Sequence, residues 1–143
     1  MAYCTLDDLE KLIPEVTLIQ LTDDEDTGAV NTERVSEAIA QADSEVDGYA
    51  GTKYSVPFTT VPPVVKKCSV DIAVYNLYSR KVEEFPATRK DRYNNAIRFL
   101  EKVAKGEISL GLDPEPTAKS EGGAECNKTS DDRVFTRTTM EGF

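Results

Sequence analysis

The feature that most constrains how this chain can fold is a segment that would be apolar on two sides if it formed a helix. It lies between Val64 and Lys81, directly after Pro62 and Pro63. One row at helical spacing comprises Val65, Cys68, Ile72 and Tyr75, and a second comprises Val70, Val74 and Leu77. A surface helix needs one apolar stripe, whereas a helix with two must be covered from both sides. The sequence therefore predicts a helical bundle with this segment at its centre.

Two further long segments predict helices that cover the central one. The first begins at Asn31, a good capping residue, and ends at Gly51, with an inner face of Val35, Ala38, Ile39, Ala42, Val46 and Tyr49. The second begins with a capping-box pattern of Thr88 and Asp91 and ends at Gly106. Its periodic face comprises Tyr93, Ala96, Ile97, Leu100 and Val103.

The N-terminal region predicts a short helix, an apolar group and an acidic loop. Thr5 and Asp8 form another capping-box pattern, and Pro14 is expected to close the helix that follows them. Residues 16–21 are mainly apolar, and residues 23–28 read as a loop. That loop resembles the start of a calcium-binding EF-hand, but Arg34 stands at the position that requires a bidentate Glu, so we expect no metal.

The fold class predicted is all-α: a small bundle of about four helices with an extended, partly disordered C-terminal tail. Residues 1–112 are expected to form the helical domain, with residues 51–63 crossing it in an extended or turning conformation and residues 108–112 packing against it. Residues 113–143 are polar and rich in Pro, Gly and Ser, which predicts a mobile tail. Its last segment, RVFTRTTMEGF, regains apolar side chains, so it is expected to order on a partner.

Charge divides the chain more sharply than the net value of -9 indicates. Residues 1–50 contain thirteen acidic side chains against two basic ones, whereas residues 51–112 contain eleven basic against six acidic ones. Such a division suits charge-complementary packing between neighbouring copies, and it also arises when helices simply face water. Both interpretations remain open at the level of sequence.

No catalytic, metal or cofactor site is predicted. The chain has no histidine, no glycine-rich phosphate loop and no paired cysteine motif, and Cys4, Cys68 and Cys126 are expected to be free thiols. We expect a binding protein and no enzyme. No signal peptide or membrane-spanning run is apparent, so we expect a protein made in a cytoplasm without membrane contact.

A basic cluster around the loop before the last helix is a weak signal for nucleic-acid binding. It comprises Arg80, Lys81, Arg89, Lys90, Arg92 and Arg98. Because the chain is acidic overall, a solvated or subunit-facing surface is the favoured interpretation.

Several stretches resemble the small head-tail connector (adaptor) proteins of Mu-like prophages and related tailed phages. They are TLDDLEKLIPE, LIQLTDD, AIAQADSEVDGYAGTKYSVPF followed by PP, DIAVYNLYSRK, RYNNAIRFLEKVAKGEISLGL and FTRTTMEGF. The resemblance spans nearly the whole chain.

The resemblance implies a structural protein of the virion neck, made in the bacterial host, that forms a ring of twelve copies. Its partners would be further copies of itself, the portal protein and a stopper or tail protein, with passive contact to DNA in the channel and no cofactor. In isolation, a monomer or loose oligomer is expected. The resemblance implies docking through Arg133, Phe135, Arg137 and Phe143, and it places the acidic turn around Asp24 toward the DNA channel or the next ring.

Two alternatives remain. One is a free-standing regulatory or nucleic-acid-binding helical module that uses the basic loop around Arg89. The other is a neck stopper or tail-completion protein, although such a protein is expected to be richer in strands.

Overall fold

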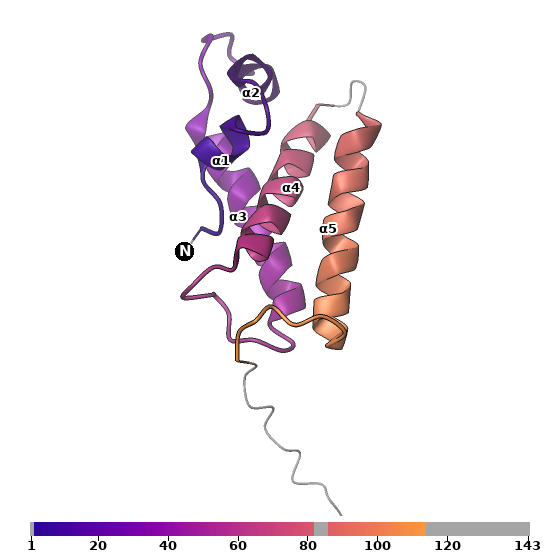
Figure 1. Cartoon of the computed structure of the whole chain (residues 1–143). Coiled ribbons are helices and arrows are strands. Elements are labelled where there is room, and N and C mark those ends of the chain that lie inside the picture. Colours follow the sequence, from indigo (N-terminus) through magenta and orange to yellow (C-terminus); the bar gives the residue numbers. More distant parts are fainter. Residues whose placement is uncertain (1, 82–85, 114–143) are drawn as a thin grey trace, which may run out of the picture.

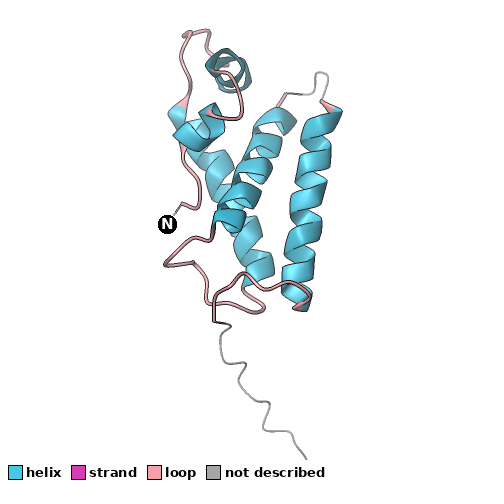
Figure 2. Ribbon diagram, viewed as in Figure 1, coloured by secondary structure: helices cyan, strands magenta, loops and turns pink. Residues whose placement is uncertain are grey.

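The computed structural model describes residues 2–81 and 86–113, and every regular element in these ranges is a helix (Figures 1 and 2). The five helices are α1 (Leu6–Glu10), α2 (Glu15–Thr22), α3 (Thr32–Ala50), α4 (Pro63–Ser79) and α5 (Ala87–Lys105). The predicted all-α class is confirmed. Among the described helices, none is both long and apolar enough to cross a membrane.

Helix α4 is the centre of the bundle, as its two apolar rows predict. It packs against α1, α2, α3 and α5. Nine of its residues are buried, namely Val65, Cys68, Ser69, Val70, Asp71, Ile72, Ala73, Val74 and Leu77. Pro63 stands at its first position, where the missing N–H costs no intrahelical hydrogen bond. Helices α3, α4 and α5 lie side by side and form the main three-helix core (Figure 1).

The first two helices are short and lie toward one end of α3 and α4 (Figure 1). The Asp8 carboxylate accepts hydrogen bonds from the Thr5 N–H at 3.1 Å and the Thr5 hydroxyl at 2.8 Å, which confirms the predicted capping interaction. Pro14 separates the helices because it serves as the N-cap of α2. The bundle therefore has five helices in its described part, where the sequence predicts about four.

The ends of α3 and α5 follow the predicted caps with one exception. The Asn31 side chain accepts hydrogen bonds from the N–H groups of Glu33 and Arg34, as expected. Thr88 was predicted as the cap of the last helix, and this is wrong. The helix begins earlier, and the Pro86 carbonyl accepts hydrogen bonds from Arg89 and Lys90. The fixed φ of proline pre-sets the chain for the turn, so no side-chain cap is needed there.

Gly106 ends α5 in the left-handed conformation, with φ 77°. The Gly106 N–H donates to the Val103 carbonyl and the Glu107 N–H to the Lys102 carbonyl, the two bonds of a Schellman motif. Residues 108–112 then pack against the core as predicted, through the partly buried side chains of Ile108, Leu110 and Leu112.

The segment between α3 and α4 adds side chains to the core. Tyr54 and Phe58 are buried, although their surroundings predict only a connecting segment. The Phe58 N–H donates to the Tyr3 hydroxyl at 3.1 Å, and the Leu110 N–H donates to the Tyr54 hydroxyl at 3.0 Å. Tyrosine hydroxyls thus hold the irregular backbone of the α3–α4 connection and of the segment after α5.

Glycines 48 and 51 give a matched pair of stability predictions. A Cβ added at Gly48, inside α3, would meet nothing within 4 Å. Because glycine destabilises a helix interior, Gly48→Ala should raise the free energy of unfolding by about 0.5–1 kcal/mol. A Cβ at Gly51 would lie 2.9 Å from the Asp47 carbonyl oxygen and 3.2 Å from Val56 Cγ2, so Gly51→Ala should lower it. Urea unfolding of both variants checks this, and equal effects of the two would contradict it.

Asp8 also predicts an acid sensitivity. A hydrogen bond from Lys66 Nζ at 2.9 Å, opposed by burial, holds the pKa of Asp8 well below its ordinary value of 3.8. A group with a lowered pKa in the folded state stabilises the fold above its ordinary pKa and loses that contribution as pH falls through the folded pKa. We expect Asp8→Asn to cost about 1–2 kcal/mol at neutral pH and to approach the wild type in stability below pH 3.8.

Urea unfolding from neutral to strongly acidic pH measures this difference, and Asp7→Asn at the exposed neighbouring position is the control. Parallel stability curves for the wild type and Asp8→Asn would contradict the prediction.

Candidate interaction surface

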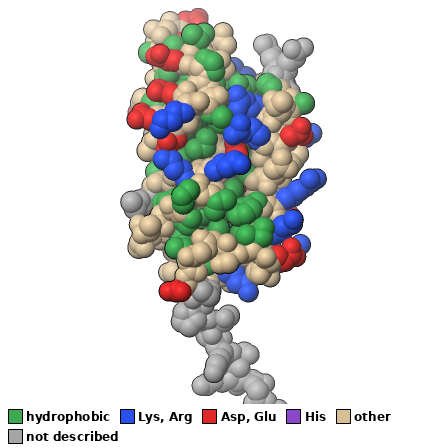
Figure 3. Space-filling view, viewed as in Figure 1, with side chains coloured by type: hydrophobic (Ala, Val, Ile, Leu, Met, Phe, Trp, Pro, Cys, Tyr) green, Lys and Arg blue, Asp and Glu red, His purple; other side chains and the backbone are tan. Residues whose placement is uncertain are grey.

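The charge division of the sequence is also a division in space. The acidic half of the chain forms α1, α2 and α3, and the basic half forms α4 and α5. Figure 3 shows Lys and Arg side chains over α4 and α5, with an apolar area beside them. Each half therefore gives the bundle an outer face of its own sign.

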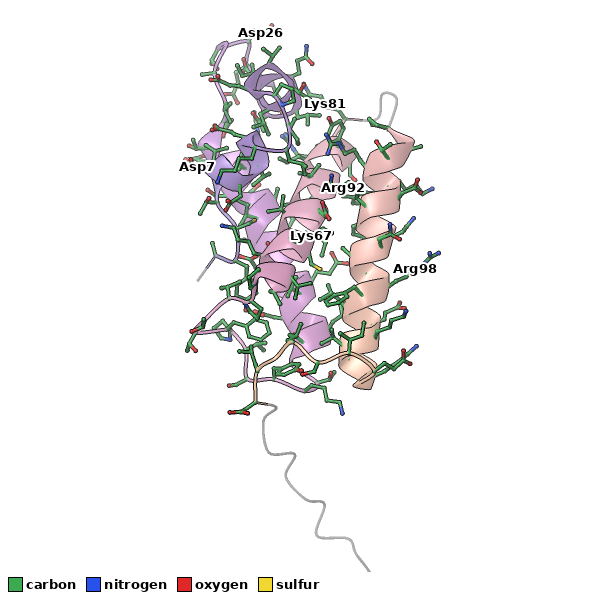
Figure 4. All side chains as sticks on the ribbon, viewed as in Figure 1. Asp7, Asp26, Lys67, Lys81, Arg92 and Arg98 are labelled. Carbon is green, nitrogen blue, oxygen red and sulfur yellow. The ribbon has the colours of Figure 1, made fainter. Side chains whose placement is uncertain are left out.

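A groove with a volume of about 440 Å³ runs between α4 and α5. It is lined by Val64, Lys67, Cys68, Asp71, Arg92, Asn95, Ala96 and Phe99. Lys67 from α4 and Arg92 from α5 lie along this seam (Figure 4). The groove thus combines two cations with partly exposed apolar side chains, and we call it the α4–α5 groove.

Asp71 of α4 and Arg92 of α5 form an ion pair in this groove. Arg92 Nε donates to Asp71 Oδ1 at 2.8 Å, and the Asp71 side chain is only 6% exposed whereas that of Arg92 is 41% exposed. A buried carboxylate is costly unless it is paired, so this contact fixes α5 against α4. Lys67 is exposed and forms no ion pair with the described residues, so its charge is available to a partner.

The acidic loop after α2 forms ion pairs with other parts of the same domain. The Asp24 carboxylate contacts Arg80 at 2.8 Å, Arg34 at 3.4 Å and Lys81 at 3.7 Å. Desolvation raises the pKa of Asp24, but the hydrogen bond from Arg80 and the nearby cations outweigh it and lower the pKa overall. Asp24 therefore joins the loop after α2 to α3 and to the C-terminal end of α4, and its charge is already balanced by these cations.

The neighbouring Asp23 closes the same loop. Its carboxylate accepts hydrogen bonds from the N–H groups of Glu25, Thr27 and Gly28 and from the Thr27 hydroxyl. These bonds, with the one from the Thr27 N–H foremost, lower the pKa of Asp23. The EF-hand-like pattern of the sequence thus corresponds to a loop that Asp23 organises with its own backbone.

Most side chains of the basic cluster around the loop before α5 form hydrogen bonds within the bundle. Arg80 donates to the Leu21 carbonyl, Lys81 to the Gln20 carbonyl and Arg89 to the Leu12 carbonyl, the last at 3.3 Å. Together with Arg92, four of the six predicted cations have internal partners. The other two, Lys90 and Arg98, are exposed on α5 and form no ion pair with the part of the chain described.

The acidic side carries a hollow of about 650 Å³ between the N-terminal segment and α3. Its lining includes Leu6, Val35, Ser36, Ile39, Ala40, Asp43, Ser44, Asp47 and Pro57. Asp43 accepts from the Tyr3 N–H at 3.0 Å and from the Ser69 hydroxyl at 2.7 Å, and Asp47 accepts from the Tyr3 hydroxyl. Burial, together with the bond to Asp47, raises the pKa of Tyr3 to about 12. We call this the α3 face.

The α3 face was missed by sequence reasoning, although a signal for it exists. Ser36, Ala40, Ser44 and Gly48 recur every four residues on the side of α3 opposite its apolar stripe, and all four are exposed. Glu33 and Glu37 flank this row and are exposed as well. A row of small side chains allows another element to approach a helix closely.

The predicted docking residues Arg133, Phe135, Arg137 and Phe143 lie outside the described residues, as does Cys126. The docking segment therefore stays a prediction. Cys4 and Cys68 are free, as expected, and both are buried, which raises the pKa of each thiol to about 11. Thiols of this kind are mainly protonated near neutral pH and are poor nucleophiles.

Fold and surface together define a class: a small all-helical protein with two outer faces of opposite charge. The family model described as Bacteriophage Mu, Gp36 matches residues 3–128, which include all five helices. The chain belongs to this family.

Two relatives agree with the family match. The chain is 40% identical to the Mu-like prophage FluMu protein gp36 of Haemophilus influenzae over 111 residues, covering 77% of this chain and 75% of that protein. It is 31% identical to Gene product J of Escherichia phage Mu over 145 residues, covering 100% and 99% of the two chains. The resemblance to Mu-like phage proteins is thereby confirmed.

The Asp71–Arg92 pair gives a prediction for the groove. Arg92→Ala should leave the Asp71 carboxylate buried without its partner and lower the free energy of unfolding by about 2–3 kcal/mol. Adding Asp71→Leu to that variant should recover most of the loss, because no buried charge then remains. Arg98→Ala, an exposed change on the same helix, is the control and should have little effect. Denaturant unfolding would contradict this if Arg92→Ala and Arg98→Ala behaved alike.

Proposed function

We propose that this protein is a structural head-tail connector, or adaptor, that forms a ring between the portal and the tail of a Mu-like phage or prophage. The observation that carries the proposal is the layout of one small helical body with oppositely charged faces, within a chain of the Mu Gp36 family. A protomer with two different and complementary faces can repeat head to tail, and such contacts close into rings.

The partners under this proposal are further copies of the same chain, the portal protein and a stopper or tail protein. The site of action is the virion neck, with twelve copies in the ring, assembly in the host cytoplasm and only passive contact with DNA. No catalytic step, cofactor or membrane is part of the proposal. The acidic turn gives little support to a channel-facing role, because Asp24 is already paired with Arg34, Arg80 and Lys81.

Helix content and internal pairing favour the connector over its rivals. A stopper or tail-completion protein is expected to be strand-rich, and residues 2–81 and 86–113 contain no strand. A nucleic-acid-binding module would need free cations around Arg89, but Arg80, Lys81 and Arg92 have internal partners, and Arg89 itself contacts the Leu12 carbonyl and the Tyr78 ring. Those contacts leave fewer charges for phosphate groups.

Deletion of the gene in its phage tests the proposal. A connector is required only after heads and tails have formed, so the deletion should leave DNA-filled heads and complete tails that do not join. Adding the purified protein to such an extract should restore joined particles, as seen by negative-stain microscopy. Normal joining without the protein would refute the connector role. A salt-sensitive shift of DNA by the purified protein, with normal particle assembly, would favour the nucleic-acid module.

The C-terminal segment gives a second prediction. A chain lacking residues 133–143 should unfold at the temperature of the full chain but lose binding to the portal protein, because its apolar and basic anchors are removed. Thermal unfolding and co-sedimentation with portal rings measure the two effects. Deleting residues 120–126 from the preceding spacer is the length control and should spare binding. A truncated chain that unfolds early would show that body and tail form one cooperative unit.

A further inference from the structure

Nothing within a single copy of the chain requires a glycine at position 48. It is exposed inside the 19-residue helix α3, no atom lies within 4 Å of a Cβ built there, and no positive φ requires it. Glycine at such a position costs about 1 kcal/mol relative to alanine. Gly48 ends the exposed row of Ser36, Ala40 and Ser44, so this side of the helix carries only small side chains.

The two serine hydroxyls of this row already donate hydrogen bonds within α3, so they need no hydrogen-bond acceptor from a partner. Ser36 Oγ donates to the Thr32 carbonyl at 2.8 Å, and Ser44 Oγ donates to the Ala40 carbonyl at 2.9 Å. A surface that covered these residues would therefore bury satisfied groups, which avoids the cost of unpaired hydrogen-bonding atoms. The remaining charges on the row's margin are those of Glu33 and Glu37, both exposed.

The α4–α5 groove has the complementary properties. Lys67 places an unpaired positive charge along it, the charge of Arg92 is balanced by Asp71, and Val64 and Phe99 add partly exposed apolar side chains. Two helices packed side by side with a groove between them can accept a third helix whose facing side chains are small. Within the described chain, α3 offers a helix of that kind with acidic margins.

We infer that the α4–α5 groove binds α3 of a second copy of this chain. The row Ser36, Ala40, Ser44 and Gly48 packs into the groove, Glu33 and Glu37 lie against its cations, and Phe99 enters the apolar hollow beside α3. The inference rests on the proposed ring and names the surfaces that build it. Charge complementarity favours this occupant, because the exposed acids Glu33 and Glu37 lie beside the row on α3 and the exposed Lys67 in the groove forms no ion pair with the described residues.

The contact is head to tail. In the three-helix core, α3, α4 and α5 contact one another, so the outer side of α3 and the α4–α5 groove point to different sides of the bundle. One copy cannot use both surfaces with the same neighbour. Each copy therefore contacts two neighbours, and the chain of contacts closes into a ring or continues as a filament.

Cysteine cross-linking tests the contact in the full chain. In a Cys126→Ser background, Glu37→Cys and Asn95→Cys place thiols at exposed positions of α3 and of the groove, while Cys4 and Cys68 stay buried. Mixing the two single variants under mild oxidation should give a disulfide-linked dimer, and neither variant alone should give one. The double variant should give a ladder of higher oligomers.

A dimer from Asn95→Cys alone would overturn the inference, because it would show a groove-to-groove contact. Absence of any cross-link in the mixture, both in concentrated solution and in assembled particles, would overturn it as well. Either result is compatible with joined heads and tails in the complementation experiment, so failure of this interface is distinguishable from failure of the connector proposal.

Charge reversal supplies the energetic test. In the same cross-linking pair, Glu33→Lys or Lys67→Glu should each reduce cross-linking yield by about tenfold, because like charges then face one another, and combining the two should restore it. Gly48→Leu should block the contact through its bulk, with Gly48→Ala as the matched control that keeps a small side chain. Circular dichroism establishes folding of each variant. Equal cross-linking by Gly48→Leu and Gly48→Ala would refute the proposed packing of the row.

Discussion

The enclosure of α4 is the constraint on which the rest of this structure depends. Val65, Ile72 and Leu77 are fully buried, and the helix is covered by α1, α2, α3 and α5. Because so much apolar surface lies on one helix, no single partner helix could remove it from water. The other four helices are arranged around α4 for this reason.

A fully enclosed helix must also satisfy its polar side chains within the protein. Ser69 donates to Asp43 of α3, and Asp71 accepts from Arg92 of α5. Among the described residues, no buried side-chain nitrogen or oxygen lacks a hydrogen-bond partner. Each of these bonds joins α4 to a different neighbour, so the polar residues of α4 fix the positions of α3 and α5 while its apolar residues supply most of the stability.

Pairing inside the bundle decides which charges remain for binding. Asp24 balances Arg34 of α3 and Arg80 at the end of α4, and Asp8 balances Lys66, so these two carboxylates are compensated inside the domain. Exposed charges without an ion pair among the described residues remain on α1 and α2, on the outer side of α3 and along α4 and α5. For a member of the Mu Gp36 family, this places opposite charges on separate faces of one protomer. The ring proposed above would need no element beyond these two faces.

The sequence by itself determined the helices and the centre of the bundle. Periodicity at three- and four-residue steps is a local property, so the double stripe of α4, the Asn31 cap and the Gly106 stop could be read directly. The start of α5 was misread because a Thr–Asp pattern can occur inside a helix that a preceding proline has already begun. The division at Pro14 was predicted, but residues 16–21 were read only as an apolar group, because α2 is too short for its periodicity to identify a helix.

Only the tertiary structure decided which charges pair and which faces are left open. Arg92 and Asp71 are far apart in sequence, as are Asp24 and Arg80, and no local pattern couples them. The burial of Tyr54 and Phe58 and the hollow beside α3 arise from where the irregular segments cross the helices. Local chemistry sets the elements of this protein, whereas their packing sets its surfaces, because a surface is made by residues that meet only after folding.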